Sequence, residues 1–380
     1  MEIYVVQRGD TAWAIARRFD VPLERLIADN QLGEEAALTV GQALLIRGEE
    51  RERERRPALS VGYAYPFIQQ EVLEETLTYL TDVFVFSWRF DREARLIGPD
   101  TPEGRMLETV RRCGGSPVLV LSSLDEEGRF DRELLSWFLN DREAQESILG
   151  QVEEAVLAGG YRGVDVDFEY ARREDREALG EFVGELRERM HRLGRPVSVA
   201  LAPKTSDDQP GILYEGMDYR LLGEAADQAL LMTYEWGYSR GQPMAVAPVN
   251  LVRRVAEYAV SRIPREKLIL GIPNYGYDWP LPFVPGETRA KTVGNVEAAR
   301  LAAALGAEIF FDEIAQTPYF YYREDGTKHV VWFEDARSIR AKLEVVRDFD
   351  LAGVGCWQIL RLFRVNWLLL ADAFAICKRG

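Results

Sequence analysis

The sequence has 380 residues, 47% hydrophobic and 29% charged, a composition typical of a globular protein with a large core. Acidic residues outnumber basic ones 62 to 47, so the net charge is −15, and we expect no nucleic-acid partner. The cysteines Cys113, Cys356 and Cys377 lie far apart, and His191 and His329 lie in charged stretches that we expect to be loops. These features argue against a disulfide framework, a metal cluster and a Ser-His-Asp triad, and we expect no cofactor.

Two further features of the sequence concern the localisation of the protein. No run of eighteen apolar residues occurs, so we expect no transmembrane helix and no membrane partner. The opening residues, MEIYVVQRGD, are strand-like and polar, without the charged start and apolar core of a secretion signal. We therefore expect a chain that is made in the cytoplasm. We also expect it to be a monomer.

The first 47 residues predict a small β-α-α-β module. Strands at Ile3–Val6 and Ala43–Ile46 flank two helices. Asp10 and Thr11 can cap the first helix, and Pro22 suits the first turn of the second. The apolar positions that we expect to face the core are Trp13, Ile15, Ala16 and Phe19 in the first helix, and Leu23, Leu26 and Ile27 in the second.

This module resembles a lysin-motif (LysM) domain over its full length. The stretch YVVQRGDTAWAIARRFDVPLERLIADNQL, followed by LTVGQALLI, carries the GDT turn, the Trp and Ala of the first helix, and the Asn of the second loop. The resemblance implies binding of N-acetylglucosamine-containing glycans such as peptidoglycan or chitin. The residues that it assigns to the groove are Gly9, Asp10, Thr11, Asn30 and Gln31. The alternative is a helical hairpin with a packing role alone.

A charged bridge follows the module. Residues 48–56 read GEERERERR, a composition typical of a solvated linker, and Pro57 ends the run. We assign residues 1–47 to the module, 48–58 to the linker and 59–380 to one large domain.

The large domain alternates apolar strands with amphipathic helices. Eight strand-like runs occur in order: SVGYAYPF, DVFVFSW, SPVLVLSS, RGVDVDFEY, PVSVALAP, QALLMTYEW, KLILGIPNYGYDW and AGVGCWQI. Repeated βα units with continuous apolar strands predict an α/β fold with a parallel sheet, and eight such units favour a closed (β/α)₈ barrel. An open doubly wound sheet is the alternative, but no Gly-rich turn supports nucleotide binding.

The connection between the seventh and eighth strands is too long for one helix. Between Trp279 and Ala352 the sequence predicts a helix at Thr292–Leu305, a hairpin at Tyr319–Phe333 and a helix at Asp335–Asp348. We interpret this stretch as a small α+β insertion on the barrel rim. Its aromatic run Tyr319, Phe320, Tyr321 and Tyr322 is either core, which we favour, or a sugar-facing wall.

Three acids alternate along the fourth strand. Asp165, Asp167 and Glu169 are two residues apart, so their side chains share one face of a strand. Inside a barrel, three carboxylates would lose hydration and repel one another, an arrangement that stability alone would not favour. A solvated edge strand would bury too little apolar surface, and a metal site is disfavoured because three acids in a line span about 13 Å.

The position of each acid along the strand predicts its chemistry. Asp165 lies deepest, and Glu169 stands at the C-terminal mouth, where barrel enzymes build their sites. Neighbouring acids cannot all ionise, so we expect Asp165 and Asp167 to share a proton and Glu169 to stay protonated. A protonated acid at the mouth can serve as the general acid of a glycosidase.

This pattern resembles the DxxDxDxE signature of glycoside hydrolase family 18, with Arg162 in place of the first Asp. Further matches are MTYE, with Glu235 in place of the usual Asp, GIPNYGYDW on the seventh strand, and Trp357 on the eighth. The small-residue pattern expected on the third strand is missing. The resemblance covers most of residues 59–380.

The resemblance implies substrate-assisted hydrolysis with retention of configuration. Glu169 would protonate the glycosidic oxygen, while Asp167 would orient the substrate's 2-acetamido group, whose oxygen attacks the anomeric carbon. The further residues that it assigns are Asp165 and Tyr234 as catalytic, and Glu235, Met232, Trp357, Tyr275 and Tyr63 as substrate-binding. An indole floor and a phenol donor suit a sugar ring.

The combination of the two domains narrows the substrate. A LysM module before the barrel, together with MTYEWGY and GQPMAVAPVN, resembles the spore-cortex hydrolases, although those usually carry two modules. The resemblance implies an N-acetylglucosaminidase that acts on cortical peptidoglycan fragments during germination and is associated with the spore. A chitinase and a non-catalytic coat lectin are the alternatives; the presence of Glu169 argues against the lectin.

Overall fold

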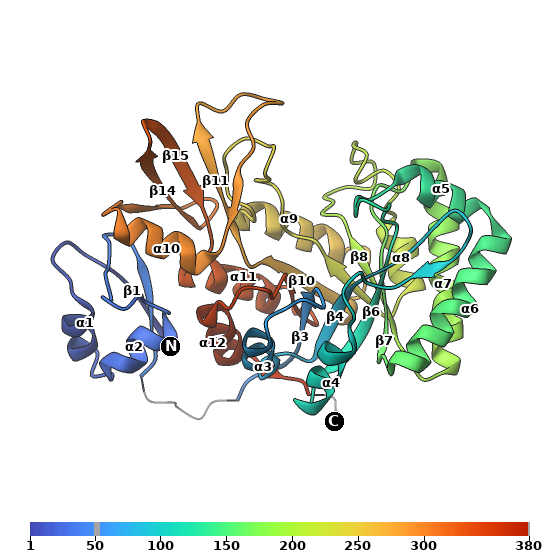
Figure 1. Ribbon diagram of the computed structural model, residues 1–380, viewed down its shortest axis with the longest axis horizontal. Helices are drawn as coiled ribbons and strands as arrows, with labels where there is room; N and C mark the ends of the chain where they lie inside the picture. The colour runs from blue at the N-terminus through green and yellow to red at the C-terminus, as the bar shows by residue number, and fades with distance from the viewer. Residues whose placement is uncertain (49–53, 379–380) are drawn as a thin grey trace.

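The computed structural model describes residues 1–48 and 54–378, so part of the predicted linker, residues 49–53, lies outside the described residues. The chain forms a small N-terminal module, a barrel and a sheet that rises above the barrel rim (Figure 1). No helix in the described residues is long and apolar enough to cross a bilayer.

Eight parallel strands close into a barrel, as predicted. Their bounds are β3 (Pro57–Ala64), β4 (Asp82–Phe90), β6 (Ser116–Ser122), β7 (Gly163–Asp167), β8 (Val197–Leu201), β9 (Gln228–Leu231), β10 (Leu268–Pro273) and β16 (Gly353–Trp357). Pairing of β3 with both β4 and β16 closes the ring. Strand β3 begins two residues before the predicted domain boundary because β17 (Ala375–Ile376) pairs with Pro57 and Ala58. A two-residue strand, β5 (Leu96–Ile97), pairs antiparallel with the end of β4.

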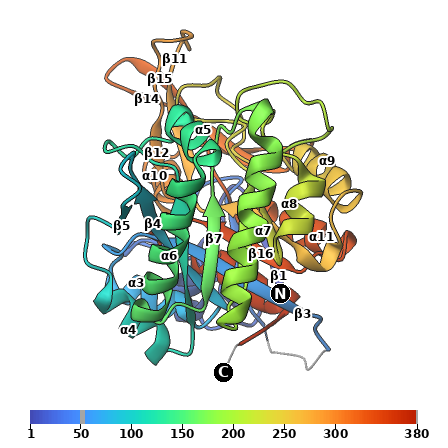
Figure 2. The same ribbon diagram turned by 90° about the vertical axis from the view of Figure 1, so that its right-hand side faces the viewer.

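Helices cover the outside of the barrel. They are α3 (Gln70–Leu77), α4 (Gly104–Arg112), α5 (Arg132–Asn140), α6 (Arg142–Gly159), α7 (Arg176–Arg192), α8 (Tyr219–Ala225), α9 (Val249–Val260), α11 (Ala336–Asp348) and α12 (Arg364–Ala373). Figure 2 shows β7 flanked by α6 and α7. The outward side chains Val164 and Val166 are fully buried, and Phe168 packs on Phe138 and Phe182. This apolar face leaves the alternate positions of β7 to point into the barrel.

The insertion between strands β10 and β16 is larger than predicted. Its antiparallel sheet has the strands β11 (Gly276–Leu281), β12 (Lys291–Val293), β13 (Ile309–Asp312), β14 (Thr317–Glu324) and β15 (Thr327–Trp332), with helix α10 (Asn295–Ala304) beside them. The predicted seventh strand was too long: β10 ends at Pro273, and Gly276–Leu281 pairs with β15 instead. Helix α11 belongs to the barrel, because it packs on α9 and α12.

The aromatic run of β14 divides between the core and the surface. Phe320 is fully buried in the insertion's own core, as favoured from the sequence, whereas Tyr321 is exposed. Both histidines were expected in loops, and this expectation was wrong. His191 lies in α7 and His329 in β15, where its Nδ1 lies 2.9 Å from Oδ1 of Asp278.

The N-terminal module has the predicted β-α-α-β order, with β1 (Glu2–Val5), α1 (Ala12–Arg18), α2 (Leu23–Asp29) and β2 (Ala43–Ile46). Thr11 caps α1 by accepting a hydrogen bond from the Ala14 amide at 3.1 Å. The expectation that Trp13 faces the core was wrong: its side chain is 59% exposed, and Ile15 fills that core instead. The cation of Arg17 lies over the exposed indole, 5.3 Å from the ring.

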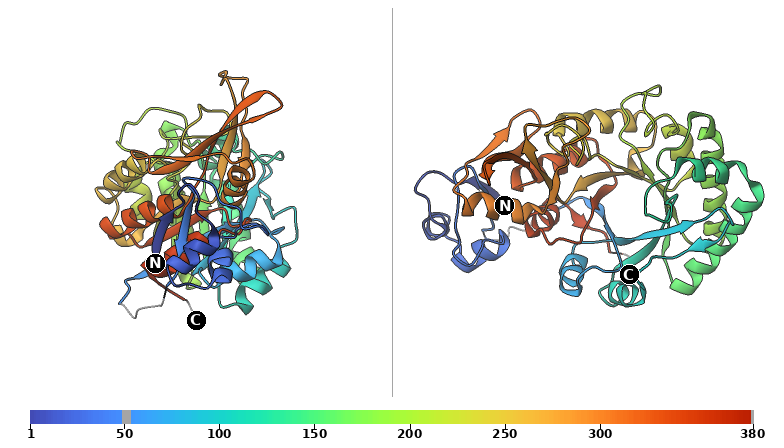
Figure 3. Two further views of the ribbon diagram at one scale, coloured as in Figure 1. Left: turned by 90° about the vertical axis from the view of Figure 1, so that its left-hand side faces the viewer. Right: turned by 45° about the horizontal axis from the view of Figure 1, so that its top comes forward.

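The module docks against the insertion and α12, where the views agree that the segments lie side by side (Figure 1, Figure 3). The guanidinium of Arg300 donates to the backbone oxygen of Gln31 at 2.7 Å, and the Gln31 side chain bonds the backbone of Leu362 and Arg364. The Ile309 amide donates to the Val40 oxygen at 2.9 Å. These backbone contacts tie the module's second loop to the barrel rim.

Candidate active site

The fourth barrel strand brings two buried acids into the interior. Asp165 is fully buried and Asp167 is 4% exposed, whereas Glu169 lies just beyond the end of β7 and is partly buried. The predicted gradient from the deep interior to the mouth is therefore present in the structure.

Asp165 is held by two hydroxyl groups. Ser198 donates to its Oδ1 at 2.5 Å and Tyr63 to its Oδ2 at 2.8 Å. Burial raises the pKa of Asp165 to about 6, and both hydrogen bonds oppose this shift because they stabilise the carboxylate. The deepest acid thus has a fixed orientation.

Asp167 has a different environment. Among the described residues, none donates a hydrogen bond to its Oδ1. Burial first, then the charges of Glu169 and Asp165, raises the pKa of Asp167 well above its usual range. An unpaired oxygen on a fixed strand is suited to receive a donor from a bound substrate.

Glu169 has the property expected of a general acid near neutrality. Burial, followed by the charge of Glu235, raises its pKa to about 7. The sequence predicted a protonated Glu169 on the grounds of repulsion within the strand. Lost hydration is the main cause, an acid from β9's side of the barrel adds to it, and Glu169 and Asp167 also repel each other.

Tyr234 faces this group of acids from the segment after β9. Its ring is 8% exposed, and Gly271 makes room for it, since a Cβ there would lie 2.8 Å from the ring. Burial raises the pKa of Tyr234 well above 10, and the charges of Asp167 and Glu169 add to the shift. Tyr234 therefore lies close to these acids, and Met232, two residues earlier in the chain, is 9% exposed.

Glu235 is anchored by two tyrosines. It lies at a positive φ of 67°, and its carboxylate accepts hydrogen bonds from Tyr275 and, at 3.0 Å, from Tyr277. Loss of hydration raises the pKa of Glu235, and the two phenols oppose that shift. The site thus holds a fourth carboxyl group in a set position.

Trp357 ends β16 among other aromatic rings. Its ring centroid lies 5.3 Å from Tyr63, 5.0 Å from Phe86 and 6.4 Å from Tyr65. Phe67 stacks on Tyr65 at 5.1 Å and is 60% exposed. This aromatic group connects the acids to the rim, because Tyr63 also holds Asp165.

The glycan-binding residues expected in the N-terminal module lie away from these acids. Gly9 is exposed, and Asp10 accepts a hydrogen bond from the Tyr4 hydroxyl at 2.7 Å. The Asn30 side chain bonds both backbone groups of Leu45, at 2.7 and 2.8 Å, and so fixes the loop rather than standing free. Gln31, in the same loop, contacts the barrel.

The sequence interpretation missed four residues of the barrel site: Ser198, Tyr65, Phe86 and Tyr277. Alternation could have found Ser198, which lies two positions before Ala200 on the inward face of β8 and pairs in register with Asp165. Tyr65 and Phe86 lie within the predicted strand-like runs SVGYAYPF and DVFVFSW, which gave no sign that these rings lie beside Trp357. Tyr277 could not be found, because the sequence does not show where β10 ends.

Two family models match the chain. The model of glycosyl hydrolases family 18 matches residues 128–361, and that of the LysM domain matches residues 4–47.

Close relatives cover the whole chain. The cortical fragment-lytic enzyme of Bacillus subtilis (strain 168) is 38% identical over 431 residues, covering 100% of this chain and 99% of the relative. The crystal structure of the Bacillus megaterium QM B1551 spore cortex-lytic enzyme SleL superposes with a TM-score of 0.94 at 31% identity, covering 100% and 99% of the two chains. A chitinase from Chromobacterium violaceum ATCC 12472, 24% identical with a TM-score of 0.77 over 84% of this chain and 99% of that one, shares the fold.

Proposed function

The chain belongs to glycosyl hydrolase family 18, and on this premise we propose that it is a retaining N-acetylglucosaminidase that acts on spore-cortex peptidoglycan fragments. The observation that carries the proposal is the row of acids on the fourth barrel strand, which ends at the barrel mouth in Glu169, close to Tyr234; burial raises the pKa of Glu169 to about 7. Such a group is protonated in a useful fraction of molecules at neutral pH and can deliver a proton.

Glu169, Asp167 and Tyr234 each have one part in this reaction. Glu169 protonates the departing glycosidic oxygen and afterwards takes a proton from the incoming water. Asp167, through its unpaired oxygen, accepts the N–H of the substrate's acetamido group, so that the acetamido oxygen attacks the anomeric carbon. The Tyr234 hydroxyl donates to that same acetamido oxygen. The proton count closes over one turnover, because Glu169 ends as it began.

The remaining residues orient the sugar. Trp357 offers its indole to the apolar face of the ring, and Met232 packs beside it. Glu235, held by Tyr275 and Tyr277, accepts hydrogen bonds from sugar hydroxyls. Asp165 orients the acidic pair from below, and Tyr63 holds Asp165 in turn.

The N-terminal module keeps the enzyme on its polymer. We assign glycan binding to the loops with Gly9, Asp10, Thr11 and Asn30, where Asn30 shapes its loop through Leu45. The proposal includes spore association, a monomeric chain, and the division into a binding module, a bridge and a catalytic barrel. Sedimentation of the purified protein tests the monomer.

The product test separates this function from a chitinase or a lectin. The enzyme is incubated with cortex fragments and with chitin oligomers, and the products are analysed by mass spectrometry. We expect cortex fragments with N-acetylglucosamine at the reducing end. Products from chitin alone would favour the chitinase, and binding without products from either substrate would favour the lectin.

A further inference from the structure

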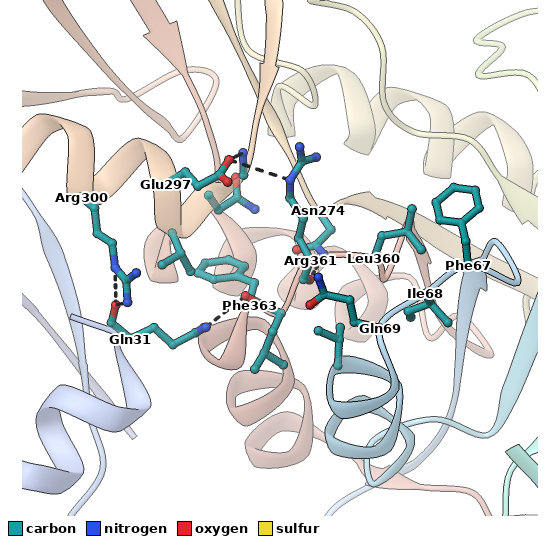
Figure 4. A pocket seen from close by; sticks show the side chains of 15 residues that line it. Gln31, Phe67, Ile68, Gln69, Asn274, Glu297, Arg300, Leu360, Arg361 and Phe363 are labelled. Atoms are coloured by element: carbon teal, nitrogen blue, oxygen red, sulfur yellow. Dashed lines mark hydrogen bonds and ion pairs between the residues drawn. The ribbon is translucent and has the colours of Figure 1, made fainter. Parts of the chain in front are cut away.

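A second cavity lies on the barrel rim, apart from the catalytic acids. Its volume is about 460 Å³, and Figure 4 shows it between the second loop of the LysM module, the start of α10 and the segments that follow β3 and β16. Its described lining contains none of the four carboxyl groups of the active site, Asp165, Asp167, Glu169 and Glu235. Gln31 of the module and Phe67 of the barrel form opposite sides, so the cavity lies between the two domains.

Two buried amides of this cavity each have an atom without a partner among the described residues. Asn295 is 2% exposed and its Nδ2 donates to no described group; Asn274 is 3% exposed and its Oδ1 accepts from none. A buried polar group without a hydrogen bond destabilises the folded protein. In the wall of a cavity, such a group points to a bonding partner that the described residues do not supply.

The other atom of each amide fixes its orientation. Oδ1 of Asn295 accepts from the Glu334 amide at 2.9 Å, and Nδ2 of Asn274 donates to the backbone oxygens of Gln358 and Arg361, at 3.0 and 2.7 Å. Neither amide can rotate without breaking these bonds. The cavity therefore presents one donor and one acceptor in set positions.

The charge around the cavity favours an anion. Arg300 and Arg361 line it, and Glu297 is the one acidic side chain in its described lining. Arg361 is 3.9 Å from Glu297, too long for a tight ion pair, and its side chain is 40% exposed. The amino-terminal end of α10, a ten-residue helix, borders the same space, and the Glu297 carboxylate caps it by accepting from the Gly294 amide at 2.8 Å, which leaves the two arginines as the source of positive charge.

A row of aromatic rings leads from this cavity to Trp357 of the active site. Phe67 lines the cavity, stacks on Tyr65, and Tyr65 lies 6.4 Å from Trp357 between ring centroids. A sugar bound over Trp357 therefore has a continuous aromatic surface toward the cavity. The backbone amide of Asn274 also donates to the backbone oxygen of Trp357 at 2.9 Å, so the cavity borders the segment that carries the indole.

We propose that this cavity binds a carboxylate-bearing substituent of the glycan strand, with Arg361 and the Asn295 amide as donors and the Asn274 oxygen as acceptor for an adjacent N–H. The proposal rests on the proposed function, since chitin carries no carboxylate. Two sources have this chemistry in peptidoglycan: the stem peptide, and the lactyl group of a muramic acid residue whose peptide has been removed.

The test measures binding without hydrolysis. Calorimetry uses the Glu169→Gln chain with and without Arg361→Gln, and titrates cortex fragments with their peptides, the same fragments after amidase treatment, and chitin tetramer. We expect Arg361→Gln to weaken binding of intact fragments about tenfold, the value of one charge-assisted hydrogen bond, and to leave chitin binding unchanged. Arg347→Gln, an exposed arginine of α11, is the matched control.

The outcomes separate the two sources and the two proposals. A loss that is present with intact fragments and disappears after amidase treatment assigns the peptide. A loss that appears only after amidase treatment assigns the lactyl carboxylate, which that treatment releases from its amide bond. Asn295→Asp keeps the acceptor for the Glu334 amide and should also weaken the binding of intact fragments. Melting curves show whether each variant is folded. Equal affinities with and without Arg361→Gln, or an equal loss with chitin, would overturn the proposal. If the active enzyme released products from chitin alone, the proposed function would be wrong. The calorimetric comparison of the chains with and without Arg361→Gln would still test the carboxylate site.

Discussion

The hydroxyl of Tyr63 donates a hydrogen bond of 2.8 Å to Oδ2 of Asp165, so the first barrel strand fixes an acid of the fourth. Ser198, from the fifth strand, holds the other oxygen at 2.5 Å. Both bonds favour the ionised carboxylate against the burial that raises its pKa to about 6. The position of Asp165 beneath Asp167 thus depends on three strands that only the closed barrel brings together.

Loss of this hydroxyl should disturb the acids above it. Tyr63→Phe removes a bond that lowers the pKa of Asp165, so that pKa should rise further and kcat should fall about tenfold. The pH profile of kcat is the readout, since a packing defect alone would not displace it. Tyr79→Phe, a tyrosine stacked on Trp367 behind the barrel, is the control. An unchanged profile in Tyr63→Phe would contradict the role.

Removal of the general acid should separate catalysis from binding. Glu169→Gln is expected to lower kcat by roughly 10²- to 10⁴-fold, the usual contribution of a positioned acid, and to leave glycan affinity close to that of the wild type. Turnover of cortex fragments and calorimetric titration measure the two effects. Glu188→Gln, on the exposed face of α7, should change neither. Substantial turnover by Glu169→Gln would remove this residue from its role.

The contact between Asp167 and the substrate's 2-acetamido group can be tested separately. Asp167→Asn keeps the shape of the side chain but removes the charge that would stabilise the cationic intermediate. We expect a loss of about 10²-fold or more in kcat. Comparison of substrates with an N-acetyl group and with a free amine at the same position shows whether the loss acts through that group. A variant with near-normal kcat would show that Asp167 does not stabilise the intermediate.

Activity should fall as the pH rises through neutrality. Because the pKa of Glu169 is about 7, its acid form is lost above that pH, and kcat/KM on cortex fragments should decline with an apparent pKa near 7. This value belongs to the coupled carboxyl groups together rather than to Glu169 alone. A rate that stays level between pH 6 and pH 9 would contradict the assignment.

The same group should cost stability at high pH. A carboxyl whose folded-state pKa is raised binds more protons in the folded than in the unfolded state, so its contribution to the free energy of unfolding falls as the pH rises from about 4.5 to about 7. Glu169→Gln removes this dependence. Its melting temperature relative to the wild type should therefore increase between pH 5 and pH 8. A constant difference would show that Glu169 is not desolvated.

The LysM module should tolerate change at its exposed tryptophan and not at its core. Trp13→Ala should alter the free energy of unfolding by about 0.5 kcal/mol or less, because the side chain is largely exposed. Ile15→Ala, at 1% exposure, should cost about 2–4 kcal/mol. Chemical denaturation of the full chain measures both, and equal losses would contradict the burial difference.

Local patterns determined much of this protein. The alternation of Asp165, Asp167 and Glu169 placed three acids on one face because the period of a strand is two, and apolar runs separated by amphipathic stretches predicted the barrel. Resemblance to known families supplied the parts assigned to Tyr234 and Trp357. The strand periodicity carries no information on neighbours across the barrel, so Ser198 and Tyr277 stayed hidden.

The tertiary structure decided the rest. Only barrel closure sets which charges lie near Glu169, and it adds burial and Glu235 to the repulsion between Glu169 and Asp167. Trp13 and Ile15 both suit the apolar face of a seven-residue helix, and the packing of the module alone decides which one is exposed. The rim cavity joins Gln31, Asn274 and Asn295 from three distant parts of the chain, and such long-range contacts leave no periodic trace in a single sequence.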